Sequence, residues 1–451
     1  MAASRLVAPL AALAASLAPA AAVPFVPSVV LSNTAAPGVS MPFIGLGCGG
    51  YSSANAGYNA YPECWIGDGG ATGGGSGTCG AFVQQAVTSW LQAGGRRLDA
   101  ANSYQDQVDV GKAMNAFIAS SGVPRADIFL LSKIGPSHPL GGADAKAQFE
   151  GILDEMQVDY VDLLLVHWPW DSASKGNVTN NATTSSVPLC NHTSPLFDER
   201  LCRLDTWRGM LDIFATGRAR AVGVSNYNVS HFEEIVAAGM PLPALTQNPF
   251  HLYRSATQSD LIDWTARHGV TFLGYSPFGV PDYHNYSFVG SPAGNQLQHP
   301  YVLSLSDKYG ATPAQVLIQW QYQLGIASSS VVAVRAPHER AAPPPPPLTL
   351  AAHPSPLPAA QPVNPRSMNA THMADNLATY ALFSGNGLNQ TEMDTLSSMP
   401  QDLCGSDASN WYEGRGKVWS REHNKNPGAG AGMEVEMLAG HARALKQEEV
   451  L

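Results

Sequence analysis

The strongest constraint on this chain is an alternation of two patterns through its middle. Short apolar runs rich in β-branched residues are typical of buried parallel strands, and amphipathic segments with helical spacing lie between them. The runs are Phe43–Gly47, Arg97–Ala100, Ile128–Lys133, Tyr160–His167, Arg220–Ser225, Leu245–Asn248, Thr271–Tyr275 and Ser330–Val334. Eight strands spaced roughly 30–40 residues apart predict an α/β fold, a (β/α)8 TIM barrel, rather than a doubly wound open sheet. We also expect an N-terminal β-hairpin from about Val29 to Met41.

Several stretches do not follow the alternation, and we interpret them as additions to one barrel domain over residues 28–400. Long loop insertions are predicted at 50–79, 170–204 and 337–362, and the last holds ten prolines. The alternative for 337–362 is an artefact of the gene model, such as a retained intron. Residues 402–451 are predicted to form a C-terminal tail that is partly disordered.

Residues 1–23 have the arrangement of a secretory signal peptide, with a basic residue, an apolar run and a small-residue cleavage site. We therefore expect a protein of the secretory pathway or a secreted protein, with a plastid transit peptide as the alternative. The chain also carries seven glycosylation sequons, at Asn177, Asn181, Asn191, Asn228, Asn285, Asn369 and Asn389. Its six cysteines include two close pairs, 64/79 and 190/202, which predict local disulfides, with six free thiols as the alternative.

Composition limits the range of partners. Charged residues make up 13% of the chain, the formal net charge is -10 and no Lys/Arg cluster occurs, so nucleic acid is not an expected partner. No apolar stretch reaches the length of a membrane span. No Cys/His spacing resembles a zinc site, so no metal is expected. We expect a monomer that acts on a small molecule.

In a (β/α)8 barrel the active site lies at the C-terminal ends of the strands. Asp99 and Tyr104 follow the second predicted strand, Lys133 ends the third and His167 ends the fourth. A phenol donates a proton poorly at neutral pH, and a nearby ammonium lowers its pKa. We therefore predict that Tyr104 donates a proton, Lys133 tunes it and Asp99 keeps the lysine charged. His167, neutral, would hydrogen-bond a substrate carbonyl oxygen and polarise it.

Six motifs in order resemble the signatures of aldo-keto reductases: LDAANSY, LLSKI, DLLLVHWP, RAVGVSN, LTQN and GYSPFG. The resemblance covers roughly residues 28–400 without the insertions. It implies reduction of aldehydes or ketones to alcohols with NADPH, with Tyr104 as proton donor and Asp99, Lys133 and His167 completing the catalytic set. The alternative is a non-catalytic barrel that binds NADPH as a regulatory or partner-binding module.

The resemblance also implies a nicotinamide site. Ser225, Asn226 and Gln247 match residues that bind the carboxamide, Tyr275 matches the aromatic that stacks on the ring, and Ser276 matches a pyrophosphate contact. The family's 2′-phosphate clamp reappears after the Pro-rich run as Arg366, Ser367 and Asn376, and Arg366 favours NADPH over NADH. Departures from the family pattern are Thr246 before Gln247, Asp106-Gln107 after Tyr104, and His372 in the clamp. We expect the sequon at Asn228 to lie too close to the cofactor loop for glycosylation.

Overall fold

The computed structural model describes residues 26–31, 38–49, 79–171, 184–252, 255, 258–278, 296–324, 327–329, 369–385 and 387–399. The first described element is an antiparallel hairpin of β1 (Ser28–Leu31) and β2 (Val39–Pro42). Side chains alternate between buried and exposed along both strands, so one face of the hairpin packs on the core. The predicted N-terminal hairpin is confirmed.

The main sheet contains eight parallel strands that pair in chain order. They are β3 (Leu46–Gly47), β4 (Arg97–Asp99), β5 (Phe129–Ile134), β6 (Leu163–Val166), β7 (Val222–Ser225), β8 (Leu245–Pro249), β9 (Thr271–Tyr275) and β10 (Ala327–Ser329). At least one helix lies between each strand and the next. This sequential parallel order is that of the predicted (β/α)8 barrel.

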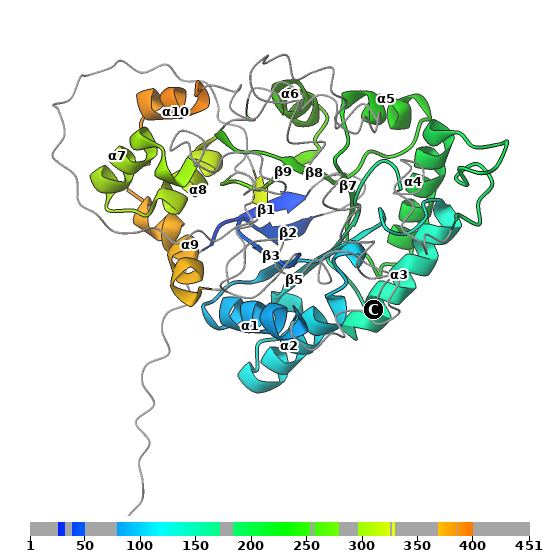
Figure 1. The fold of residues 1–451 in the computed structure, drawn as a ribbon, viewed down its shortest axis with the longest axis horizontal. Helices are drawn as coiled ribbons and strands as arrows, with labels where there is room; N and C mark the ends of the chain where they lie inside the picture. The colour runs from blue at the N-terminus through cyan, green and yellow to red at the C-terminus, as the bar shows by residue number, and fades with distance from the viewer. Residues whose placement is uncertain are drawn as a thin grey trace, which may run out of the picture. The chain divides into compact units, whose positions relative to one another are not determined.

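The helices lie around the strands (Figure 1). They are α1 (Cys79–Gln92), α2 (Gln107–Ser121), α3 (Gly142–Met156), α4 (Glu199–Ala215), α5 (Val229–Ala237), α6 (Ser259–Arg267), α7 (Pro300–Tyr309), α8 (Pro313–Gln323), α9 (Ala370–Leu382) and α10 (Gln390–Ser397). The described residues also include the short 3-10 helices η2 (Asn102–Tyr104), η3 (Arg125–Asp127) and η6 (Gln296–Gln298).

Helix α9 packs against both α8 and α1. It therefore joins the helix before the last barrel strand to the helix after the first one. Phe43, just before β3, makes edge-on ring contacts with Tyr322 of α8 and Tyr380 of α9. The centroids of the two tyrosine rings are 5.1 Å apart. This aromatic cluster brings the start of the first barrel strand beside the helices that flank the last one.

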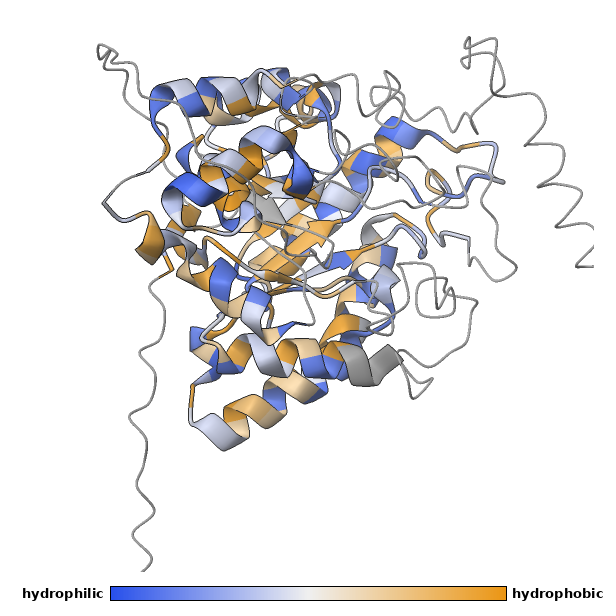
Figure 2. Ribbon diagram, turned by 60° about the vertical axis from the view of Figure 1, so that its left-hand side comes forward, coloured by the Kyte–Doolittle hydropathy of each residue, from blue (hydrophilic) through white to orange (hydrophobic). Residues whose placement is uncertain are grey.

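The central strands are buried on both faces. Every residue of β5, β6, β7 and β8 is buried. In Figure 2 the apolar colour gathers on strands and helix faces near the centre of the molecule. Such burial is expected of parallel strands covered by helices on one side and by the barrel interior on the other. Burying a polar side chain in these strands costs free energy unless the side chain is hydrogen-bonded. Polar side chains at the strand ends are therefore candidates for a functional site.

The eighth strand is described over Ala327–Ser329, which pairs with β9. The predicted run Ser330–Val334 follows it directly and lies outside the described part of the chain. Register is decided by pairing across the sheet, which a single strand's composition does not report.

The predicted insertion at 170–204 is shorter than expected at its C-terminal end, because α4 already begins at Glu199. Residues 184–198 form turns that dock on the start of α3: Ser185 and Ser186 both donate to the carboxylate of Asp144. Cys190 and Cys202 form a disulfide, which confirms one predicted pair. Cys64 of the other pair lies outside the described residues, as do 1–23, 337–362 and 402–451.

Replacing both Cys190 and Cys202 by alanine should lower the free energy of unfolding by about 3 kcal/mol, because the disulfide closes a short loop and thereby restricts the unfolded chain. Urea denaturation of the wild type and the double variant measures the difference. A thiol reductant should destabilise the wild type more than the variant, because only the wild type has this bond to lose. Equal loss of stability in both proteins on reduction would contradict a stabilising role for this bond.

Three sequon asparagines cap helices. Asn228, Asn369 and Asn389 are the N-cap residues of α5, α9 and α10, and each side chain accepts from a backbone N–H of the first turn. Unpaired N–H groups at a helix start favour such side chains. The asparagines therefore have a structural role in the fold, and their glycosylation stays a prediction.

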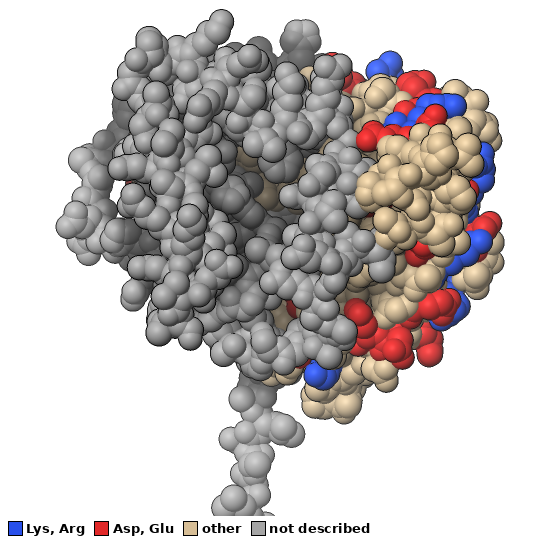
Figure 3. Space-filling model, turned by 45° about the vertical axis from the view of Figure 1, so that its right-hand side comes forward, with Lys and Arg blue, Asp and Glu red and all other residues tan. Residues whose placement is uncertain are grey.

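Acidic and basic side chains are interspersed on the described part of the face in Figure 3. Several form ion pairs, including Lys146 with Asp212 and Arg218 with Glu150. Among the residues that the structure describes, we find no helix with the length and apolar character that a membrane crossing requires.

Candidate active site

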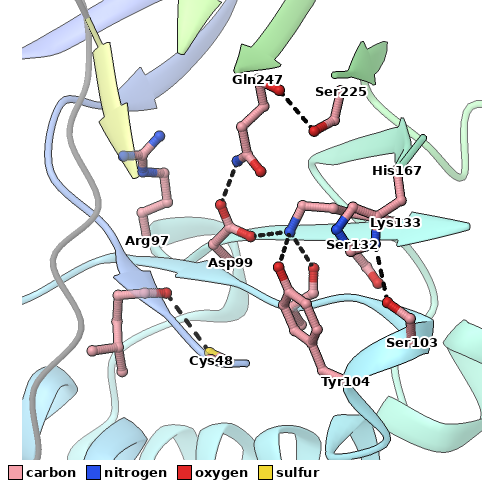
Figure 4. A network of polar contacts seen from close by, with 12 residues as sticks. Cys48, Arg97, Asp99, Ser103, Tyr104, Ser132, Lys133, His167, Ser225 and Gln247 are labelled. Atoms are coloured by element: carbon pink, nitrogen blue, oxygen red, sulfur yellow. Dashed lines mark hydrogen bonds and ion pairs between the residues drawn. The ribbon is translucent and has the colours of Figure 1, made fainter. Parts of the chain in front are cut away.

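Four side chains singled out in the sequence lie together where strands β4, β5 and β6 end (Figure 4). Asp99 is the last residue of β4, and Tyr104 ends η2 directly after it. Lys133 lies on β5, and His167 follows β6. The parallel register places the C-terminal ends of these strands on one rim, because Asp99 pairs with Leu131 and Lys133 pairs with Leu165.

Lys133 is the centre of this group. Its side chain is fully buried, and its ammonium donates to the carboxylate of Asp99, which is 2% exposed. The same Nζ donates to the carbonyl of Ala100 at 3.0 Å and to the phenol oxygen of Tyr104 at 3.1 Å. A buried ammonium needs this full set of acceptors to remain charged. The geometry therefore holds a positive charge against the phenol oxygen.

Tyr104 is held by contacts on its ring as well as on its hydroxyl. The Nζ of Lys133 lies 4.8 Å from the ring centroid. The chain turns sharply after the tyrosine, since Gln105 has φ 56 in the left-handed region, and α2 then begins at Gln107. An ammonium in this position can stabilise negative charge on a phenol oxygen.

Gly49 lies directly beneath this ring and was missed in the sequence. A Cβ at position 49 would be 2.8 Å from Cδ2 of Tyr104, closer than real Cβ atoms approach. The contact joins the end of β3 to η2, and only a residue without a side chain leaves room for it. The Gly-rich run around position 49 was a signal, but nothing in it identifies the tyrosine as the neighbour.

Gly49→Ala should lower kcat for the carbonyl reduction that the sequence predicts by about 10- to 100-fold, because the new methyl group displaces the ring of Tyr104. Steady-state kinetics with NADPH measures the effect. Gly151→Ala is the matched control, since a Cβ at that position in α3 meets no atom within 4 Å. Unchanged kcat in Gly49→Ala would show that the tyrosine ring does not depend on this contact.

His167 lies beside the same group of side chains. Its ring meets that of Tyr104 edge-on, with centroids 5.5 Å apart. Burial, and next the charge of Lys133, hold the pKa of His167 well below its usual 6.5, against a hydrogen bond with the backbone of Gly135 that raises it. The imidazole is therefore neutral at physiological pH, as the sequence predicted. A second unpredicted residue, Ser103, lies with Oγ 3.0 Å from Nδ1 of this ring.

Gln247 and Ser225 extend the network across the rim. Gln247 Nε2 donates to the second carboxylate oxygen of Asp99 at 2.6 Å. Ser225 Oγ donates to the main-chain carbonyl of Gln247 at 2.7 Å. Strands β7 and β8 thus connect directly to the carboxylate that holds Lys133, so the predicted carboxamide residues and the predicted catalytic residues share one network (Figure 4).

Asn226 and Ser276 follow β7 and β9 with φ 61 and φ 55, in the left-handed region. Residues other than glycine adopt this region at a cost, and such strain concentrates at functional sites. Asn226 Nδ2 donates to the carbonyl of His167 at 2.9 Å, and its Oδ1 accepts from the hydroxyl of Tyr275 at 2.9 Å. The amide of Asn226 therefore links three strand ends.

Two of the departures from the family pattern, Gln107 and Thr246, form side-chain hydrogen bonds. Gln107 accepts from the hydroxyl of Ser132 and donates to Glu155 at 2.7 Å, which ties the start of α2 to β5 and α3. Thr246 Oγ1 donates to Asn248 Oδ1 at 2.7 Å. Both substituted positions are thus hydrogen-bonded within the barrel.

The predicted phosphate clamp is only partly described. Asn376 lies on α9 with its side chain buried. Arg366 and Ser367 lie outside the described residues, so their roles stay predictions.

Comparison with known proteins gives consistent matches. Residues 66–342 match the model of the Aldo/keto reductase family. An aldo-keto reductase of Mycolicibacterium vanbaalenii is 30% identical over 300 residues, which is 66% of this chain and 80% of that protein.

Two solved structures share the fold. The crystal structure of an aldo-keto reductase complexed with NADPH has a TM-score of 0.58 at 23% identity, covering 84% of this chain and 88% of that one. The Bombyx mori aldo-keto reductase in complex with NADP has a TM-score of 0.59 at 21% identity, covering 86% and 96%.

Proposed function

The chain belongs to the aldo/keto reductase family, and from this premise we propose that it reduces aldehydes or ketones to alcohols with NADPH, with Tyr104 as the proton donor. Family membership supports an oxidoreductase. The single observation that carries the finer assignment is the buried ammonium of Lys133, which contacts both Asp99 and the hydroxyl of Tyr104.

Each residue of the group has a chemical task in this proposal. The carbonyl oxygen of the substrate lies between the hydroxyl of Tyr104 and the imidazole of His167. His167 donates a hydrogen bond that polarises the carbonyl, and Tyr104 transfers its proton as negative charge builds on that oxygen. Lys133 stabilises the phenolate that remains, and Asp99 balances the charge of the lysine.

The nicotinamide site is proposed at the rim formed by β7, β8 and β9. When bound, the cofactor supplies the hydride that adds to the carbonyl carbon. The residues present fit a carboxamide: among the described residues no partner is recorded for Oε1 of Gln247, whose Nε2 is used by Asp99, so this oxygen can accept an amide N–H. The partly exposed ring of Tyr275 offers a stacking surface beside it. The 2′-phosphate selectivity rests on Arg366, Ser367 and Asn376. NADPH in the solved relative supports the same cofactor here.

The decisive experiment mixes the purified full chain with NADPH and nitrobenzaldehyde and follows the loss of NADPH absorbance. Turnover supports the reductase. Quenching of intrinsic fluorescence by NADPH without turnover would replace the proposal by the alternative, a barrel that binds NADPH as a regulatory or partner-binding module. Absence of both binding and turnover would refute both functions.

We also propose that the protein passes through the secretory pathway. The disulfide of Cys190 with Cys202 supports this, because such bonds persist in oxidising compartments. Mass spectrometry of the mature N-terminus and of the sequon peptides tests the route. Removal of the N-terminal segment as a plastid transit peptide, with all sequons unmodified, would favour the plastid.

A further inference from the structure

Among the described residues, Ser103 has the side-chain hydrogen bond recorded for the imidazole of His167, and the mechanism above does not use it. Its Oγ lies 3.0 Å from Nδ1 of the ring (Figure 4). Ser103 belongs to η2, after β4, whereas His167 follows β6, so the contact spans two strand ends of the barrel. The adjacent residue on η2 is Tyr104, whose ring meets the imidazole edge-on. Serine and tyrosine therefore hold the imidazole from neighbouring positions.

A neutral imidazole carries one proton, on either Nδ1 or Nε2, and only the protonated nitrogen can donate a hydrogen bond. Polarising a carbonyl oxygen requires a donor. Because Nδ1 of His167 is turned toward Ser103, we take Nε2 as the nitrogen that meets the substrate. The hydrogen bond of the ring with the backbone of Gly135 competes for the single ring proton, so the hydroxyl of Ser103 has to outweigh it. The tautomer of the ring thus decides whether the residue assists the reaction or opposes it.

We propose that Ser103 sets this tautomer: its hydroxyl donates to Nδ1 of His167, which places the ring proton on Nε2, facing the substrate oxygen. The role in catalysis rests on the reductase proposed above, whereas the tautomer itself does not. In the opposite tautomer Nδ1 would donate to Oγ, and the serine hydrogen would need another acceptor. Among the described residues Nδ1 is the acceptor recorded for this hydroxyl. A net hydrogen bond biases such an equilibrium by roughly tenfold.

The backbone of His167 is held by contacts that do not depend on Ser103. The main-chain carbonyl of His167 accepts from Asn226 Nδ2 at 2.9 Å, and its main-chain N–H donates to Ile134 at 3.0 Å. The partly exposed serine can therefore lose its hydroxyl without loss of the fold. Ser103 is a positioning residue that acts through the imidazole, and a variant should change the proton location more than the ring location.

The direct test is nitrogen NMR of the full chain labelled with 15N in its histidine rings, without cofactor or substrate. The signals of His167 are assigned by their absence in His167→Gln. In the wild type, Nδ1 should have the chemical shift of an unprotonated nitrogen and Nε2 that of a protonated one. Ser103→Ala should give averaged shifts, and Ser103→Thr, which keeps the hydroxyl, should restore the wild-type pattern. A protonated Nδ1 in the wild type, or an unchanged pattern in Ser103→Ala, would overturn the proposal.

Kinetics provide the second readout. Ser103→Ala should lower kcat roughly tenfold while the Kd for NADPH stays the same, and Ser103→Thr should recover most of the rate. Ser120→Ala is the matched control, because this exposed serine of α2 bonds only its own helix carbonyl at Phe117. Full kcat in Ser103→Ala despite averaged shifts would refute the catalytic part. If the NMR result holds but no variant, including the wild type, reduces a carbonyl, the reductase assignment fails and the tautomer assignment stands.

Discussion

Tyr104→Phe should lower kcat for carbonyl reduction by about 100-fold or more, because general acid catalysis by a positioned group contributes roughly 10²–10⁴-fold. The phenylalanine keeps the ring that packs over Gly49 and beneath the ammonium of Lys133, and removes only the proton donor. The affinity for NADPH should therefore change little. Steady-state kinetics gives kcat, and fluorescence quenching by NADPH gives the Kd.

The chain offers a matched control for this change. Tyr309 on α7 also accepts from a lysine, since its hydroxyl lies 3.3 Å from Nζ of Lys308, but the pair lies on the exposed side of the helix beside Glu392. Tyr309→Phe should leave kcat unchanged. Equal activity of Tyr104→Phe and the wild type would remove the phenol from the mechanism, and with it the proposed use of the buried ammonium.

Lys133→Met should lower the free energy of unfolding by about 3–5 kcal/mol, because it leaves the buried carboxylate of Asp99 without its countercharge. Urea denaturation measures the loss. The double variant Asp99→Asn/Lys133→Met removes both charges and should recover much of the stability, although neither protein should reduce a carbonyl. A single variant as stable as the wild type would show that Asp99 does not depend on the lysine.

The control for this experiment is an exposed ion pair of the same chemistry. Lys146 and Asp212 are 50% and 62% exposed. Lys146→Met should therefore cost less than about 1 kcal/mol, because water already solvates both charges. The difference between the two lysines isolates burial as the cause, since both substitutions remove one ammonium from one carboxylate.

Much of the fold could be predicted because burial leaves a periodic trace in the chain. Strands such as Phe129–Ile134 and Thr271–Tyr275 are buried against helices and must be apolar, so their positions were visible in the sequence. The described part of the eighth strand, Ala327–Ser329, was not among the predicted residues, because it is held by pairing with β9 and has no apolar run.

Part of the candidate site could also be predicted from the sequence. The strand-end rule and the order of the motifs singled out Asp99, Lys133 and His167, since each occupies a position where a barrel turns its polar residues toward one rim. The disulfide of Cys190 with Cys202 was also predictable, because the two cysteines are close in sequence.

The sequence by itself determined the barrel, its hairpin and the kinds of side chain on its rim, because those depend on local periodicity and on the chemistry of each residue. Only the tertiary structure decided which side chains touch. Gly49 lies beneath the ring of Tyr104 and Ser103 meets His167 because strands far apart in the chain end side by side. No local pattern encodes such a contact, since its distance is set by the packing of the whole barrel.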